Sequence, residues 1–114
     1  MNVDEYFEST RFLKFKESIL TELNNALVNL GSDDPKVRKK GEKTLSSNSR
    51  RELGWNCLPI RDWFLDANNQ EALFGVIKHE SEDKLLAGYL STLVFFYERY
   101  VTHSMWEEIH DASV

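Results

Sequence analysis

The segment LTELNNALVNLGSDDPKVRKKGEKTL, Leu20 to Leu45, decides the fold of this chain. Apolar residues recur in it every three or four positions, which is the spacing of one face of a helix. The SDDP sequence in its middle supplies a cap for a second helix and a proline in the first helical turn, where the missing N–H is not needed. The segment therefore predicts two consecutive helices joined by a tight turn.

The first of these helices extends toward the N-terminus. Its apolar face predicts a helix over residues 10 to 30, closed by Gly31 in the left-handed conformation that commonly ends helices. Residues 4 to 7 are expected to form a short turn of their own. The inward face consists of Phe12, Phe15, Ile19, Leu23, Ala26, Leu27 and Leu30.

The second helix carries many cations. Residues 36 to 51 contain seven Lys/Arg and one Glu, whereas the rest of the chain contains seven Lys/Arg and eighteen Asp/Glu. We interpret the basic run as the solvated face of a short helix. This helix packs on the rest of the chain through a narrow stripe of inward-facing residues, in which Gly41 permits a close helix contact. Residues 46 to 49 are expected to form a loop. The alternative is a contact with nucleic acid or with an acidic protein, through Lys36, Lys39, Lys40 and Lys43.

The second half of the chain has a helical pattern of its own. Large side chains between residues 49 and 67 are expected in the core, with a turn before Pro59 and a short helix after it. Asn68-Asn69 is expected to be a loop, followed by a helix over residues 70 to 78. Residues 81 to 83 then cap a helix whose wide apolar face predicts a place at the centre of the core. That face comprises Leu85, Leu86, Tyr89, Leu90, Leu93, Val94, Phe96, Tyr97, Tyr100 and Val101.

The two helix pairs are spaced as repeats. Their apolar positions match at offsets of roughly 47 to 48 residues, within or just past the range of HEAT and armadillo repeats. Leu20 to Leu45 resembles a HEAT repeat in particular, with an Asp-Pro turn and a second helix opened by Val37-Arg38; Glu71 to Leu93 is similar but lacks the Pro and the Arg. We expect one all-α domain over residues 1–114, either a short HEAT-like α-α superhelix or an irregular helical bundle, of about five to seven helices.

Composition limits the partners. The chain has 114 residues and a net charge of -5, so most of its surface should repel nucleic acid and attract basic proteins. It has one cysteine and an acidic N-terminal stretch, and its longest apolar run, residues 93 to 97, is far shorter than the ~20 residues of a membrane span. We expect a soluble cytoplasmic protein with no membrane partner.

Few residues offer catalytic or metal chemistry. Cys57 lies among large apolar residues and is expected to be buried rather than reactive. His103, Glu107 and His110 would share one face of a helix over residues 102 to 112, but their spacing is not that of a known zinc site. We therefore expect no enzyme activity, no metal and no cofactor.

Two acidic clusters are candidate partner sites. At the C-terminus, carboxylates surround a tryptophan, which can anchor a contact while the charges steer a basic partner. The alternative is a terminal amphipathic helix whose Trp106 packs on the core. The second cluster precedes the last apolar helix, where helix capping is a sufficient explanation. The candidate residues are Trp106, Glu107, Glu108 and Asp111 in the first cluster and Glu80, Glu82 and Asp83 in the second.

The size, acidity and helical-repeat character of the chain resemble those of bacterial immunity proteins. This resemblance implies direct binding to a cognate toxin, which in this class of proteins is often a basic nuclease. It also implies that the chain inhibits the toxin by covering the toxin's active site or an adjacent surface. The alternative is a regulatory or phage-encoded binding protein that acts on a nucleic-acid-processing complex through the basic helix of residues 36–51.

Overall fold

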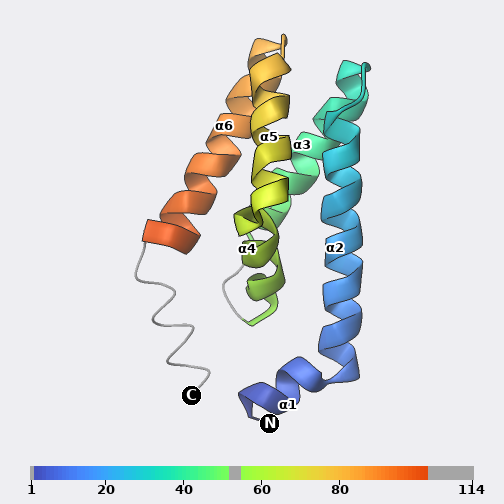
Figure 1. Ribbon diagram of the computed structural model, residues 1–114, viewed down its shortest axis with the longest axis vertical. Coiled ribbons are helices and arrows are strands. Elements are labelled where there is room, and N and C mark those ends of the chain that lie inside the picture. The colour runs from blue at the N-terminus through green and yellow to red at the C-terminus, as the bar shows by residue number, and fades with distance from the viewer. Residues whose placement is uncertain (1, 52–54, 103–114) are drawn as a thin grey trace.

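The computed structural model describes residues 2–51 and 55–102, and in these ranges the chain is all-α, without a strand (Figure 1). The predicted fold class is therefore confirmed. The molecule is elongated, with extents of 47 × 29 × 22 Å. Its elements are α1 (Val3–Glu8), α2 (Thr10–Leu30), α3 (Pro35–Ser49), the 3-10 turn η1 (Trp55–Cys57), α4 (Leu58–Leu65), α5 (Ala67–His79), α6 (Asp83–Tyr97) and the π-helical segment η2 (Glu98–Thr102).

Helix α2 has the bounds that its apolar spacing predicts. The Ser9 hydroxyl caps its start by accepting a hydrogen bond from the Phe12 N–H at 3.2 Å. At its end, Gly31 has φ of -86°, so the expected left-handed conformation is wrong. The Gly31 N–H instead bonds the Val28 carbonyl at 3.0 Å, which continues the helical turn into the connection.

The turn from α2 to α3 follows the prediction closely. The Asp34 carboxylate accepts a hydrogen bond from the Lys36 N–H at 2.9 Å, and Pro35 occupies the first helical position. Helix α3 then packs against α2 through Gly41, where an added Cβ would lie 2.6 Å from the Ala26 carbonyl oxygen. The predicted close contact at Gly41 is confirmed, because no larger residue fits there without moving backbone.

The serine-rich stretch after this contact is helical. Residues 46 to 49 form the last turn of α3, so the predicted loop is wrong. The side chains of Ser47 and Ser49 donate hydrogen bonds to backbone carbonyls three residues earlier, at 3.1 and 2.8 Å. Asn48 bonds the Thr44 carbonyl at 2.9 Å. Polar side chains that would favour a loop are thereby satisfied inside the helix.

The region around Pro59 forms two short elements and then α5. Pro59 lies in the first turn of α4, where it is tolerated, and η1 provides the turn expected before it. Asp66 caps α5 by accepting a hydrogen bond from the Asn69 N–H at 3.0 Å. The predicted loop at residues 68 and 69 is wrong, because this cap starts the helix at Ala67, earlier than the sequence pattern indicated.

The helices form two antiparallel pairs that lie side by side. Helices α2 and α3 make the first pair, α5 and α6 the second, and α4 continues into α5 (Figure 1). Across the pairs, α3 packs against α6, and α2 packs against α4 and α5. Consecutive pairs of an α-solenoid also stack in this way, and the HEAT resemblance stays a prediction.

The core lies between the pairs and is rich in aromatic side chains. Phe96 stacks between Phe64 and Tyr100, with ring centroids 4.6 and 5.1 Å away. Cys57 is buried there as expected. The core residues are Ile19, Leu23, Ala26, Leu30, Leu45, Cys57, Ile60, Trp63, Phe64, Leu73, Leu85, Tyr89, Phe96 and Tyr100.

Helix α6 does not sit at the centre of this core. Leu85, Tyr89 and Phe96 are buried, but Leu90 and Val94 on the other side are 46% and 57% exposed. The prediction that the whole apolar face is buried is therefore wrong. Helix α6 lies at one edge of the molecule in Figure 1 and packs against α3 and α5.

Candidate functional site: a groove at the helix turns

The described part of the chain contains an open groove of about 470 Å³ beside the α2–α3 turn. One wall is the end of α2 and the turn itself, and the other is the C-terminal half of α5. The lining residues are Leu30, Gly31, Ser32, Asp33, Arg38, Ala72, Gly75, Val76, His79, Glu80 and Ser81. Residues more than forty positions apart in sequence thus form one concave surface, which is the usual shape of a binding site.

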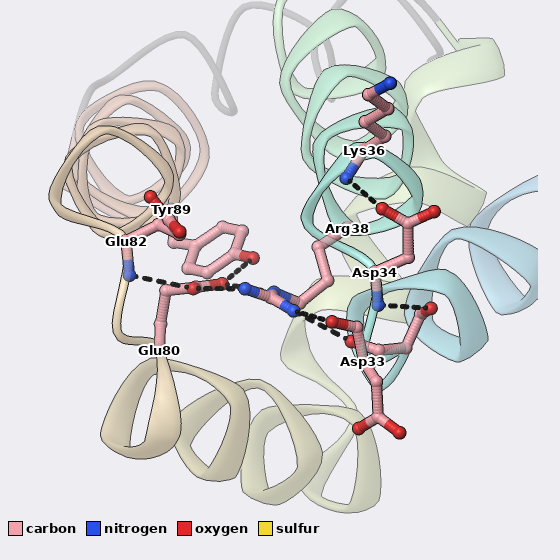
Figure 2. A network of polar contacts seen from close by, with 8 residues as sticks. Asp33, Asp34, Lys36, Arg38, Glu80, Glu82 and Tyr89 are labelled. Atoms are coloured by element: carbon pink, nitrogen blue, oxygen red, sulfur yellow. Dashed lines mark hydrogen bonds and ion pairs between the residues drawn. The ribbon is translucent and has the colours of Figure 1, made fainter.

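An ion pair joins the two walls of the groove. Arg38 of α3 binds Glu80 in a bidentate manner, with Nε–Oε1 and Nη2–Oε2 distances of 2.9 and 3.0 Å (Figure 2). The guanidinium also donates from Nη1 to the Ser32 and Asp33 carbonyls at 3.0 and 3.1 Å. Arg38 therefore fixes the conformation of its own turn and ties that turn to the end of α5.

Glu80 is fully engaged by its neighbours. Tyr89 of α6 donates its hydroxyl to Oε1 at 2.6 Å, and the Glu82 N–H donates to Oε2 at 3.1 Å (Figure 2). The Glu80 side chain is 1% exposed and the Arg38 side chain 14%. One carboxylate thus organises α3, the α5–α6 connection and α6 in a single network.

The network changes the acidity of its members. Burial by itself raises the pKa of the Glu80 carboxyl, but the hydrogen bonds from Arg38 and Tyr89 outweigh it, so the pKa lies below the ordinary 4.5. Burial, followed by the hydrogen bond to Glu80, raises the pKa of the Tyr89 hydroxyl. Both effects keep Glu80 ionised and Tyr89 protonated at neutral pH, which are the states that the hydrogen bonds require.

The electrostatics of the groove favour a cationic occupant. Helices α2 and α5 both end at the groove, with Leu30 and His79 as their last residues, and the carbonyl end of a helix carries partial negative charge. The positive N-terminal ends of α3 and α6 lie at the same two connections and offset these dipoles, as Arg38 offsets Glu80, so the exposed Asp33 gives the groove its negative charge. A lysine or arginine side chain fits this environment.

Gly75 leaves space in the wall that α5 contributes. A Cβ placed on Gly75 would meet no atom within 4 Å, in contrast to Gly41. The helix thus presents bare backbone toward the groove, and a larger side chain at this position would project into open space. Gly75 is accordingly the residue at which the groove can be filled without disturbing the core.

The second predicted acidic cluster, Glu80, Glu82 and Asp83, lies next to the groove, and its members differ in exposure. The Glu80 carboxylate is held inside the fold, so we leave it out of any contact surface. Glu82 and Asp83 are exposed. Glu82 is the cap residue of α6 but its side chain makes no capping hydrogen bond, so the capping explanation does not account for this carboxylate.

The first predicted cluster, Trp106, Glu107, Glu108 and Asp111, lies outside the described residues, as do His103 and His110 of the considered metal site. In the described ranges, no group of three or more His, Cys, Asp or Glu side chains could hold a metal ion. None of the described helices is long and apolar enough to cross a membrane.

The basic face of α3 is exposed at all four predicted positions, Lys36, Lys39, Lys40 and Lys43. Further along the chain, Arg50 lies over the Phe95 ring with its guanidinium carbon 4.5 Å from the centroid, and Arg99 lies over the same ring at 5.8 Å. These two cations are thereby occupied with an aromatic side chain, whereas the lysines face solvent.

Sequence reasoning missed Arg38 and Tyr89 as members of the site. Arg38 is one cation in a run of several, and only its place just after the Asp-Pro turn distinguishes it from the lysines. Tyr89 counted as one of many apolar positions of α6. No family model, curated protein or solved structure matches this chain, so its function must be argued from the groove.

Proposed function

We propose that this chain is a non-catalytic cytoplasmic binding protein that docks on a basic protein and inhibits it, as an immunity protein neutralises its toxin. The groove carries this proposal. Its walls come from the ends of two helices and favour a cation, and the ion pair of Arg38 and Glu80 holds those walls in place before any partner arrives. Such preorganisation reduces the entropic cost of binding.

In this proposal, a lysine or arginine of the partner enters the groove beside Asp33. The aliphatic part of that side chain would lie against Leu30, Ala72 and Val76, which line the groove. The exposed carboxylates of Glu82 and Asp83 lie close by and would steer the approach. A basic nuclease uses such cations to hold its substrate, so covering them would inhibit it.

The C-terminal cluster provides a second contact in the same proposal. Trp106 would supply the apolar anchor, and Glu107, Glu108 and Asp111 would add to the steering. The proposal predicts that reversing these three charges slows association without changing the melting temperature. An unchanged association rate would remove this cluster from the contact surface and leave the groove as the remaining site.

The decisive experiment is capture of a partner with the intact groove and with the groove filled. Immobilised wild-type protein and a Gly75→Trp variant are exposed to nuclease-treated lysate of the source cell, and retained proteins are identified by mass spectrometry. Asn25→Trp, at an exposed position on α2 outside the groove, is the matched control. Circular dichroism and thermal melting establish that all three proteins are folded.

We expect wild type and Asn25→Trp to retain one stoichiometric basic protein whose activity is lost in the complex, and Gly75→Trp to retain at least about tenfold less. A retained protein that keeps full activity would contradict inhibition. Equal retention by Gly75→Trp would exclude the groove as the contact, and retention of no stoichiometric protein would contradict the binding function.

The exposure of Lys36, Lys39, Lys40 and Lys43 supports one alternative function. They form a continuous basic face on α3 that could contact a nucleic-acid-processing complex. In that case Lys39→Glu combined with Lys40→Glu would abolish binding, and the affinity of wild type would fall steeply with salt. The groove proposal predicts that this double variant still captures its partner.

A further inference from the structure

A small cavity lies in the core where the two helix pairs meet. Its volume is about 10 Å³, which is the space that one water molecule needs. Residues of α2, α3, α4, α5 and α6 line it, among them Leu45, Leu73 and Thr92. Leu30 and Val76 line both this cavity and the groove, so they form the wall between the two.

The hydroxyl of Thr92 is a buried polar group on the wall of this cavity. Thr92 is 3% exposed, and its Oγ1 has no hydrogen-bond partner within the described ranges. A threonine in a helix can bond the carbonyl three or four residues earlier, which here belongs to Tyr89 or Gly88, but Thr92 makes neither bond. Because an unpaired buried hydroxyl is unfavourable, the cavity favours an occupant that pairs with it.

The carboxylate of Glu42 reaches the same cavity from α3, the helix that packs against α6. Glu42 is partly buried and makes no hydrogen bond or ion pair with another described residue. Its position depends on Gly88 of α6, where an added Cβ would lie 2.7 Å from Glu42 Oε1. The bare backbone of Gly88 thus admits the carboxylate to α6 about one helical turn before Thr92.

We infer that this cavity is a binding site for one water molecule, which joins Thr92 of α6 to Glu42 of α3. An ionised carboxylate only accepts hydrogen bonds, so the water donates one bond to Glu42. It forms a second bond with the Thr92 hydroxyl, which can donate or accept. Two to four polar partners are typical of a buried water, and the cavity has no room for a larger molecule.

The bound water adds a polar link between the two helix pairs. The link already described is the network in which Arg38 of α3 and Tyr89 of α6 both bond Glu80. Tyr89 also lines the cavity, so the two links are neighbours. The water site therefore extends polar pairing from the helix turns into the core, and it does not depend on the proposed function.

Nuclear magnetic resonance tests the site directly in a protein of 13.3 kDa. A bound water gives nuclear Overhauser peaks to the methyl groups beside it. Leu45 and Leu73 line the cavity but are only 4% and 6% exposed, so bulk water hardly reaches them. We expect peaks between water and both of these residues in the wild-type protein.

Two variants of Glu42 distinguish a bound water from exchange of the Thr92 hydroxyl proton with solvent. Glu42→Met has a similar length but no carboxylate, so the peaks should weaken at least about fivefold although Thr92 is intact. Glu42→Gln keeps an accepting oxygen and should keep the peaks. Gly88→Ala should weaken them, because its methyl group displaces the Glu42 carboxylate. Circular dichroism establishes that each variant is folded.

Thermal melting tests the same site through the sign of one effect. Thr92→Val replaces the hydroxyl with a methyl group and should lower Tm by about 4 °C, because the water loses a partner. Removing a hydroxyl that has no partner at all would raise Tm instead. Thr44→Val is the matched control, since Thr44 is partly buried in α3 but does not line the cavity. It should change Tm by less than about 2 °C.

A wild-type protein without water peaks at Leu45 and Leu73 would overturn the inference, as would a rise in Tm for Thr92→Val. Peaks of full strength in Glu42→Met would assign the signal to the Thr92 hydroxyl and would also overturn it. All of these measurements use the protein without a partner, so the water site and the groove can fail separately.

Discussion

The two helix pairs have similar apolar spacing but bury it differently. In the α2–α3 pair, one apolar face of α2 is buried from Phe12 to Leu30, although Leu13 and Val28 outside that face are exposed, and Gly41 brings the backbone of α3 against that of α2. In the α5–α6 pair, Leu73 is the buried residue of α5, and one side of α6 stays exposed. The difference shows that spacing predicts a helix, whereas its neighbours determine which apolar residues are buried.

The largest difference in the free energy of unfolding is expected between two substitutions in α6, one on its buried side and one on its exposed side. Phe96→Ala removes a ring that stacks on Phe64 and Tyr100, and should lower the free energy of unfolding by about 4 kcal/mol. Val94→Ala, two residues away on the exposed side, should change it by less than about 0.5 kcal/mol. Urea denaturation of both variants measures this. Similar losses would mean that both sides of α6 are packed.

Breaking the ion pair between Arg38 and Glu80, which connects the two helix pairs, should lower stability nearly as much. Glu80→Gln leaves Arg38 without its buried counter-charge, so we expect a loss of about 3 kcal/mol in the free energy of unfolding. Glu82→Gln, at an exposed carboxylate in the same connection, is the control and should have little effect. Chemical denaturation compares the two, and equal stability of both variants would show that the ion pair does not hold the helix pairs together.

Replacement by alanine should change the stability of the protein in opposite directions at Gly41 and Gly75. Gly41→Ala forces a methyl group against the Ala26 carbonyl and should cost about 2 kcal/mol. Gly75→Ala meets no atom within 4 Å and gains helix propensity, so it should raise stability by about 1 kcal/mol. Thermal melting distinguishes them. A stable Gly41→Ala variant would show that the α2–α3 contact is looser than described.

The smallest expected effect is a pH dependence of stability. The folded-state pKa of Glu80 lies below its ordinary value, so its contribution is complete above about pH 5 and is lost as the pH falls through the folded-state pKa. Wild type should therefore lose more stability than Glu80→Gln between pH 5 and acid conditions. Melting curves over that range measure the difference, and parallel pH profiles would contradict the assignment of the shifted pKa to Glu80.

Much of the first helix pair was predictable from local chemistry. The apolar period fixed the bounds of α2, and Asp34 and Pro35 marked the start of α3 because caps and first-turn prolines act within a few residues. The errors have local causes too. Asp66 starts α5 ahead of two asparagines, and the serines at the end of α3 bond to backbone carbonyls within the helix.

The groove was not predictable in the same way. Its walls come from residues 30 to 38 and 72 to 81, and only tertiary packing brings them together. Arg38 and Glu80 were each visible as charges, but nothing in the sequence distinguishes this one pair from the other combinations of cation and carboxylate. The exposure of Val94 likewise depends on the absence of a neighbouring helix in the described fold, which a periodic pattern does not reveal.

The burial of Cys57 has a practical consequence. It is the only cysteine of the chain, and it lies in the core beside the aromatic stack. A thiol reagent can modify Cys57 only when the segment around α4 opens, so the labelling rate of the native protein reports how often that segment opens. The native chain thus carries a probe of this opening at one internal atom, without an added dye.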